Sequence, residues 1–459
     1  MIKITIANPL ECRVARKHAK HLKPAISFPA EFWRQTFKGR ERIQYEKTCW
    51  IHKGKDEFTF YRGHLPRVLK HLKDKKFLIK LIKEDTITPE INVKFKPDLG
   101  KYEERDYQID MLKSAVNAKR GIIVAPTGTG KTIMQIGILS IFKDYPTLIL
   151  AHTIDIVQQT TDKLLAEGYD VEMLGGGQTF AGAFTSQVVV STVQSFKKVP
   201  QDQRAFAVIM VDETHHVSKF DGTYGQVLSS MLAPVRLGFT ATMYDEKTEA
   251  CFAATGLLGP VIKKMTIHEA AGKKILAKPV IRFIRVPKND RIRRIRKYDQ
   301  VIQEGVVDNR IRNGLITEKA MKEYQKGEVI LIFVNHIEHG ENLQTIFEYA
   351  YNIEVPFVQG SMKGKDRLRV KKGLESKTIR MAIATVTWKE GIDIPSITVV
   401  INAAGGKSEI GVLQSIGRGL RRKGDKTQVT IYDVFDQSNS FLIDHFGERL
   451  SLYMENNWL

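Results

Sequence analysis

The eight residues from Ala125 to Thr132 read APTGTGKT, and their types and spacing suit the binding of a nucleoside triphosphate. Gly128 and Gly130 allow the backbone to turn its N–H groups inward around anionic phosphates. Lys131 would then hold the β- and γ-phosphates, and the Thr132 hydroxyl would hold Mg²⁺. An apolar run precedes the loop and a helical pattern follows it, which is the setting that a phosphate-binding loop requires. The sequence therefore predicts a site for ATP with Mg²⁺.

Two adjacent carboxylates, Asp212 and Glu213, follow a second apolar run, Ala205–Val211. This run predicts a buried strand, and open α/β sheets place their ligand sites at the carboxyl ends of such strands. Asp212 is expected to hold Mg²⁺ directly or through water, and Glu213 to act as the base that directs water at the γ-phosphate. An Asp-Glu pair after a strand can also be a simple helix cap. Downstream of a phosphate loop, the catalytic interpretation is favoured.

A third group lies near the C-terminus, where residues 414–422 read QSIGRGLRR. Arg418 and Arg421 are three residues apart and share one face of the expected helix. Paired guanidinium groups suit the charge that builds up on a transferring phosphoryl group. The same pair could be ordinary basic surface, but the lone phosphate loop elsewhere in the chain favours the catalytic interpretation.

Strands and helices alternate twice along the chain, which predicts an α/β fold with two parallel sheets covered by helices. In residues 98–277 the expected strands are Gly121–Val124, Thr147–Ala151, Val188–Ser191, Val208–Val211 and Leu237–Thr240. In residues 278–459 they are Val329–Val334, Arg380–Ala384, Thr398–Asn402 and Thr427–Tyr432. The segment from Phe441 to the end predicts a packing helix, with Phe446, Leu450 and Tyr453 at helical spacing.

Residues 1–97 differ from the rest in charge and pattern. Short strand-like pieces surround a helical pattern at Leu65–Leu72, which predicts a small α+β domain. This segment holds 23 Lys and Arg against 10 Asp and Glu, so it carries +13 of the chain's net +20. A surplus of that size suggests a polyanionic partner, with a solubilising surface as the alternative. We therefore expect a basic DNA-binding module.

The cysteines and the hydropathy exclude other classes of protein. Cys12, Cys49 and Cys251 lie too far apart for a CxxC metal pair and are expected to be reduced thiols. The sequence has no apolar stretch of membrane-spanning length and no signal-peptide core, so no membrane partner is expected. We expect a cytoplasmic protein, in the host cytoplasm if a phage encodes it.

The order of these motifs resembles that of superfamily 2 helicases and translocases over about residues 98–435. The carboxylate motif reads DETH where the family has DEAH or a close variant. Similar segments exist for the family's other motifs: Arg105–Gln108 (RDYQ), Leu150–Thr153 (LAHT), Ser191–Gln194 (STVQ), Thr240–Thr242 (TAT), Ile330–Val334 and Ala384–Pro395. The resemblance implies two RecA-like lobes that bind ATP between them.

The resemblance also implies roles that the spacing alone does not. The residues that would bind ATP are Arg105, Gln108, Thr127, Gly128, Thr129, Gly130, Lys131, Thr132, Gly391 and Asp393. Gln414 would act in catalysis with the paired arginines. Those expected near the nucleic-acid backbone are Thr153, Thr192, Gln194 and Thr385. His215, Thr240 and Thr242 would couple the two sites. Each threonine could instead be a helix cap or a strand-face residue.

A closer likeness is to phage recombination and branch-migration helicases and, more loosely, to the XPB-like group. It rests on the small basic N-terminal module, the RDYQ motif, the triplet Gly175–Gly177 and the short second lobe. It implies an ATP-dependent DNA helicase or translocase, acting as a monomer, that remodels branched DNA by fork regression or Holliday-junction branch migration in recombination, repair or replication. Its DNA would be branched or duplex, with single strands also possible.

Two other functions share these motifs. An RNA helicase has the same lobes, and a nucleic-acid clamp could use the ATP site as a switch without processive movement. A nuclease or restriction subunit is less favoured, because the sequence reveals no further cluster of metal-binding carboxylates.

Overall fold

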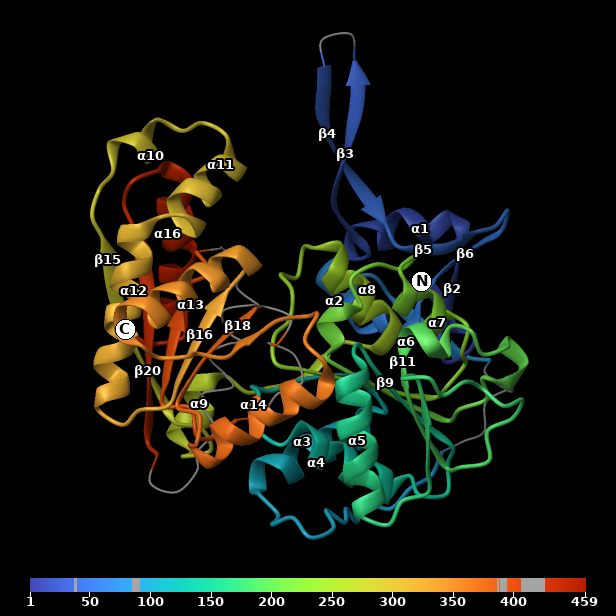
Figure 1. Ribbon diagram of the computed structural model, residues 1–459. Coiled ribbons are helices and arrows are strands. Elements are labelled where there is room, and N and C mark those ends of the chain that lie inside the picture. Colours follow the sequence, from blue (N-terminus) through green and yellow to red (C-terminus); the bar gives the residue numbers. More distant parts are fainter. Residues whose placement is uncertain (37–38, 85–90, 386–387, 389–393, 406–425) are drawn as a thin grey trace. The chain divides into compact units, whose positions relative to one another are not determined.

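The computed structural model describes residues 1–36, 39–84, 91–385, 388, 394–405 and 426–459 (Figure 1). The chain forms two compact units, one of residues 1–125 and 130–264 and the other of residues 126–129 and 265–459. The predicted α/β class is confirmed: each unit contains a parallel sheet, and the first also contains a largely antiparallel sheet. Among the described residues, no helix combines the length and apolar character of a membrane span.

The N-terminal module is built on a five-stranded sheet in the order β5-β6-β2-β1-β7. Its strands are β1 (Ile2–Ile6), β2 (Glu11–Ala15), β5 (Trp50–Lys53), β6 (Glu57–Tyr61) and β7 (Ile79–Lys83). Its helices are α1 (Arg16–Leu22) and α2 (Leu65–Asp74), with the short turns η1 (Lys23–Ala25) and η2 (Arg62–His64). Helix α2 turns Leu65, Val68 and Leu72 towards the core, as the spacing of these residues predicts.

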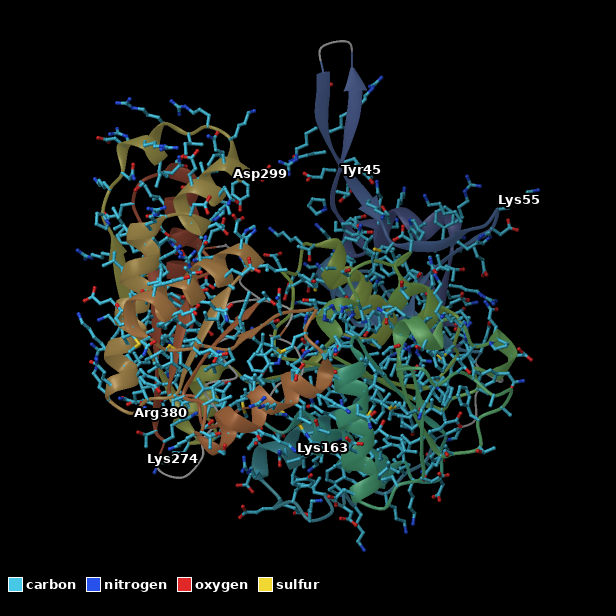
Figure 2. All side chains as sticks on the ribbon, in the orientation of Figure 1. Tyr45, Lys55, Lys163, Lys274, Asp299 and Arg380 are labelled. Carbon is cyan, nitrogen blue, oxygen red and sulfur yellow. The ribbon has the colours of Figure 1, made fainter. Side chains whose placement is uncertain are left out.

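Strands β3 (Ser27–Thr36) and β4 (Gly39–Thr48) form a separate two-stranded ribbon, paired from Ser27↔Thr48 to Thr36↔Gly39. Figure 1 shows the ribbon running away from the five-stranded sheet, and Figure 2 labels Tyr45 on it. A two-stranded ribbon is only marginally stable in water, so this one depends on contacts at its base. There the ring of Phe28 packs on that of Phe252 at 5.2 Å, and Lys47 Nζ lies 2.6 Å from Glu249 Oε1.

The base of the ribbon is one part of a larger contact between the N-terminal module and helix α8 (Glu249–Leu258). His64 is buried, with its Nε2 2.9 Å from the carbonyl oxygen of Phe252. Tyr61 stacks on Phe220 with ring centroids 4.6 Å apart. Gly63 lies so close to α8 that any side chain would overlap the carbonyl oxygens of Thr255 and Gly256. The module is therefore packed onto the first parallel sheet's helical layer as part of one unit.

We expect Gly63→Ala to lower the free energy of unfolding by about 2–3 kcal/mol, because the added methyl group must push the module away from α8. Gly447→Ala, in an open position on a helix, is the control and should be neutral or slightly stabilising. Denaturant unfolding of both variants measures the difference. Equal stabilities would contradict the close packing at Gly63.

The first parallel sheet has the order β10-β11-β9-β12-β13-β8-β14. Its strands are β8 (Arg120–Val124), β9 (Thr147–Ala151), β10 (Val171–Leu174), β11 (Val188–Thr192), β12 (Val208–Asp212), β13 (Val235–Thr240) and β14 (Val261–Lys264). The helices besides α8 are α3 (Asp106–Ala118), α4 (Lys131–Ile141), α5 (Ile154–Ala166), α6 (Val193–Phe196) and α7 (Thr223–Ser229), with the turns η3 (Gln201–Gln203) and η4 (Thr214–His216). Every strand predicted for this part of the chain is present.

The second parallel sheet has the order β15-β20-β19-β16-β18-β17. Its strands are β15 (Lys278–Val286), β16 (Ile330–Val334), β17 (Phe357–Val358), β18 (Met381–Thr385), β19 (Val399–Asn402) and β20 (Gln428–Asp436). The helices are α9 (Ile267–Gly272), α10 (Asp290–Arg294), α11 (Tyr298–Ile302), α12 (Arg310–Gln325), α13 (Ile337–Tyr351), α14 (Gly364–Ser376) and α16 (Ser440–Glu455), with the short π-helix η5 (Gln303–Val307). The strands predicted here are also present.

Helix α16 closes the second unit and is fixed by a buried polar network. Arg449 Nε donates to Asp433 Oδ2 at 2.8 Å, and the Tyr453 hydroxyl donates to the same oxygen at 2.9 Å. A buried carboxylate needs such donors, because an unpaired charge would be costly in the core. Phe446 and Tyr453 are both buried, which confirms the predicted packing helix.

Candidate nucleotide-binding site

The phosphate loop connects β8 to α4, as the sequence predicts. Gly128 and Gly130 have φ angles of 93° and 85°, which are conformations that favour glycine. Thr129 Oγ1 donates to the carbonyl oxygen of Pro126 at 2.8 Å, and Lys131 Nζ lies 3.4 Å from that of Ala125. These bonds shape a turn whose backbone leads directly into the N-terminus of α4, a suitable place for an anionic phosphate.

The adenine-motif residues lie on and before helix α3. The Gln108 side chain is buried against the phosphate loop, where a side chain on Gly130 would overlap its amide nitrogen. Arg105 is the N-cap residue of α3, and its Nη1 lies 3.4 Å from the Tyr107 hydroxyl. The structure thus brings Gln108 to the loop, while adenine recognition by either residue stays a prediction.

The carboxylate pair lies at the end of β12, a central strand of the sheet. Burial raises the pKa of Asp212 to about 6; the neighbouring Glu213 carboxylate adds to this rise and the Lys131 ammonium opposes it. The backbone N–H of Glu213 donates to Asp212 Oδ1 at 3.1 Å. A carboxyl group in this setting would be stabilised in its ionised form by a nearby cation.

Asp212 and Thr132 offer carboxylate and hydroxyl oxygens, the ligands that a hard divalent cation takes. In the described parts of the chain, no three His, Cys, Asp or Glu side chains are grouped as a metal site. A cation held here would therefore need phosphate oxygens and water to complete its coordination, which fits a metal that arrives with a nucleotide.

His215 links the carboxylates to the next strand, β13. Its Nδ1 lies 3.4 Å from Glu213 Oε2 and 3.1 Å from Thr240 Oγ1. The Thr240 hydroxyl donates its own hydrogen to the carbonyl oxygen of Thr242 at 2.7 Å, so it must accept from His215. Nδ1 is therefore the protonated nitrogen. This joins the three residues that the family resemblance assigns to coupling.

Two of the three threonines expected near nucleic acid, Thr153 and Thr192, are helix caps in this structure. The Thr153 hydroxyl accepts from Ile156 N at the start of α5, and the Thr192 hydroxyl accepts from Ser195 N at the start of α6. Strands β9 and β11 are neighbours, so both caps lie along the same carboxyl edge of the sheet. Gln194 is exposed in α6, and Thr385 is buried at the end of β18 in the second unit. A contact with nucleic acid stays a prediction for all four residues.

Other predicted site residues lie outside the described part of the chain. They are Gly391, Asp393, Gln414, Arg418 and Arg421, which fall in residues 389–393 and 406–425. Their roles stay predictions.

Sequence reasoning missed the contact between His152 and His216. Their rings are stacked with centroids 3.7 Å apart and planes 8° apart. His152 lies between β9 and α5, and His216 follows the DETH motif directly. Both residues stand beside recognised motifs, but no spacing rule predicts that residues 64 positions apart will stack.

Comparisons with known proteins identify the family. A model described as "Type III restriction enzyme, res subunit" matches residues 101–245, and one described as "Helicase conserved C-terminal domain" matches residues 313–423. The "DNA 3'-5' translocase XPB2" of Sulfurisphaera tokodaii is 26% identical over 372 residues, which cover 72% of this chain and 81% of that protein. The "ATP-dependent DNA helicase uvsW" of Enterobacteria phage T4 is 26% identical over 385 residues, which cover 77% of this chain and 75% of that protein.

A solved structure of Saccharomyces cerevisiae Dbp5 bound to RNA and ADP BeF3 shares the fold, with a TM-score of 0.55 and 16% sequence identity. The match covers 76% of this chain and 88% of the Dbp5 chain. The two family models lie in the predicted order and include the phosphate loop, the carboxylate pair and the arginine-rich motif. Enzymes with these domains use ATP and a divalent cation. The chain therefore belongs to the superfamily 2 helicases and translocases, in the group that includes UvsW-like and XPB-like proteins, and is an ATP hydrolase.

Proposed function

We propose that this protein is an ATP-dependent DNA motor that remodels branched DNA, such as replication forks and four-way junctions, during recombination, repair or replication. The observation that carries the proposal is the hydrolytic set Lys131, Asp212 and Glu213, joined through His215 to Thr240. A protein that only bound ATP as a clamp would not need a positioned base. The two relatives that are named as a DNA translocase and a DNA helicase support DNA as the track.

In the proposed cycle, Lys131 binds the β- and γ-phosphates at the N-terminus of α4, and Thr132 and Asp212 would hold Mg²⁺. The bound ion supplies charge neutralisation at the phosphate oxygens. Glu213 orients a water molecule and accepts its proton, while His215 holds the Glu213 carboxylate in place. Arg418 and Arg421, with Gln414, are expected to stabilise the charge on the transferring phosphoryl group.

The steady-state ATPase rate with different polymers tests this proposal. The rate should rise with DNA and be highest with a four-way junction, compared with no polymer, single-stranded DNA, duplex DNA and RNA. Stimulation by RNA alone would make the protein an RNA helicase. Stimulation by DNA without strand displacement or junction migration would favour the ATP-switched clamp.

The exposed faces of α1 and α2 are the proposed grip on the branch. These two helices pack side by side, and their exposed lysines are Lys17, Lys20, Lys70 and Lys73. Exposed lysines suit a phosphate backbone, which they bind without reading base sequence. Deleting residues 1–97 would be a poor test, because it would expose the face of α8 that carries Phe252.

The double variant Lys20→Gln with Lys70→Gln is expected to weaken junction binding about tenfold. If both lysines contact phosphates, the slope of the logarithm of the binding constant against the logarithm of the salt concentration should become shallower by about 1.8. Lys53→Gln with Lys55→Gln removes the same charge from β5 and the β5–β6 turn of the module and is the control (Figure 2 labels Lys55). Fluorescence anisotropy with a labelled four-way junction and a labelled plain duplex measures both. Equal losses for the two variants, or equal losses on junction and duplex, would contradict the grip on the branch.

A further inference from the structure

The stacked rings of His152 and His216 bridge two neighbouring strands of the first sheet. His152 follows the end of β9, His216 lies in η4 just after β12, and β9 and β12 are paired in parallel. A centroid separation of 3.7 Å with nearly parallel planes is face-to-face contact over the ring area. A movement of either loop must therefore displace the other or break the stack.

The stack is continuous with the hydrolytic carboxylate. Glu213 Oε2 lies 3.4 Å from His215 Nδ1, and the His215 and His216 ring centroids are 4.3 Å apart. Thr214, which lies between Glu213 and His215 in the sequence, is buried, and its hydroxyl lies 3.1 Å from the carbonyl oxygen of Val211. Because Thr214 ties this turn to the sheet, a displacement at Glu213 is passed along the turn rather than absorbed within it.

The other end of the stack meets the start of helix α5. The residue after His152 is Thr153, whose hydroxyl caps α5 through Ile156 N at 3.4 Å. The neighbouring Ile154 side chain would lie 3.1 Å from a side chain added at Gly175 or Gly176, so these two glycines pack on this helix start. The array of side chains thus runs from Glu213 to the edge where Thr153 and Thr192 begin their helices.

We propose that the His152–His216 stack is a coupling contact that transmits the state of the ATP site to the nucleic-acid contacts at the start of α5. The stack and the contact of His215 with Thr240 lead in opposite directions from the carboxylate pair, because β9 and β13 lie on opposite sides of β12. His152 and His216 act as positioning residues, with no contact to the reacting atoms. The proposal rests on the proposed function, since it assigns a regulatory link within that motor.

Packing explains why a stack is suited to this role. Closely packed groups have a few discrete arrangements and do not deform continuously, so a sub-ångström shift at Glu213 can select between stacked and unstacked rings. The expected signature is a coupling free energy: ATP binding changes DNA affinity, and DNA changes ATP affinity by the same factor.

The test measures the affinity for a fluorescent four-way junction with and without a non-hydrolysable ATP analogue. The ratio of these two affinities is the coupling factor. His152→Leu introduces a side chain of similar size that has no planar ring and cannot stack, and His216→Leu does the same from the other loop. Either variant should bring the coupling factor at least about threefold closer to one, and the double variant should cause no further loss. His152→Phe, which retains a planar ring, should keep most of the coupling.

Several outcomes distinguish the proposal from simpler explanations. Leucine variants with the wild-type coupling factor would overturn it, as would equal affinity losses with and without the analogue, or additive losses in the double variant. A Phe variant as defective as the Leu variant would also overturn stacking as the cause. Unfolding midpoints of all variants check the fold, and His216→Leu gives an independent result if His152→Leu does not fold.

The proposed function fails by a different result. If the junction did not change the ATPase rate of the wild-type protein, and the ATP analogue did not change its affinity for the junction, the motor itself would be contradicted. A wild-type protein that couples, with leucine variants that couple equally well, would contradict only the role of the stack.

Discussion

Lys131→Ala is expected to lower ATP turnover by about 10²- to 10³-fold while the protein stays folded. The ammonium group stands at the N-terminus of α4, where it would neutralise charge on the β- and γ-phosphates. Its Nζ lies 3.4 Å from the Ala125 carbonyl oxygen, which is a long hydrogen bond, so the substitution removes little that stabilises the fold. Phosphate release at saturating DNA and the unfolding midpoint measure the two effects separately.

Lys113→Ala, on the exposed face of α3, is the matched control and should keep wild-type turnover. Turnover retained in Lys131→Ala would show that the phosphate site lies elsewhere. A large fall in the unfolding midpoint would instead assign Lys131 a structural role.

Glu213→Gln is expected to lower turnover by about 10²- to 10⁴-fold while nucleotide binding persists. The amide has the shape of the carboxylate and can keep its place beside the His215 ring, whose Nδ1 lies 3.4 Å from the present Oε2. It cannot accept a proton from the attacking water, so hydrolysis should stop after ATP has bound. Single-turnover phosphate release and equilibrium binding of a fluorescent ATP analogue separate the two steps.

Glu103→Gln removes an exposed carboxylate before α3 and should leave both quantities unchanged. If Glu213→Gln retained turnover, the base would be another group. If it lost nucleotide binding to the same extent as turnover, Glu213 would act in binding and not in the chemical step.

The amino-acid sequence by itself determined the centres of both parallel sheets. Runs such as Val208–Val211 and Ile330–Val334 are apolar on both faces because helices cover both sides of these strands, and such runs stand out in the sequence. The strands that the sequence did not predict in these sheets, β10, β14, β15 and β17, are the four edge strands. Strands β10, β14 and β15 are only partly buried and include charged residues, so they carry no comparable signal. Strand β17 is buried but has only two residues, too few to form a pattern.

The phosphate loop and the carboxylate pair were also determined by the sequence. Their chemistry depends on neighbouring residues, such as the glycines that allow positive φ at Gly128 and Gly130, and neighbours in sequence are neighbours in space. The same locality let the sequence predict α2 and α16 from the spacing of their buried residues.

Only the tertiary structure decided how the N-terminal module packs on helix α8 and which histidine rings stack beside the carboxylate pair. His64 meets Phe252 across 188 positions of the chain, and His152 meets His216 across a stretch of chain that contains the three strands β10, β11 and β12. Neither contact has a local pattern, because a histidine at a strand end is compatible with many partners and the sheet order selects one. Sequence spacing fixes what lies along one element, whereas packing between elements fixes which side chains meet. This is why the positions of the phosphate loop and the carboxylate pair followed from the sequence and the His152–His216 stack did not.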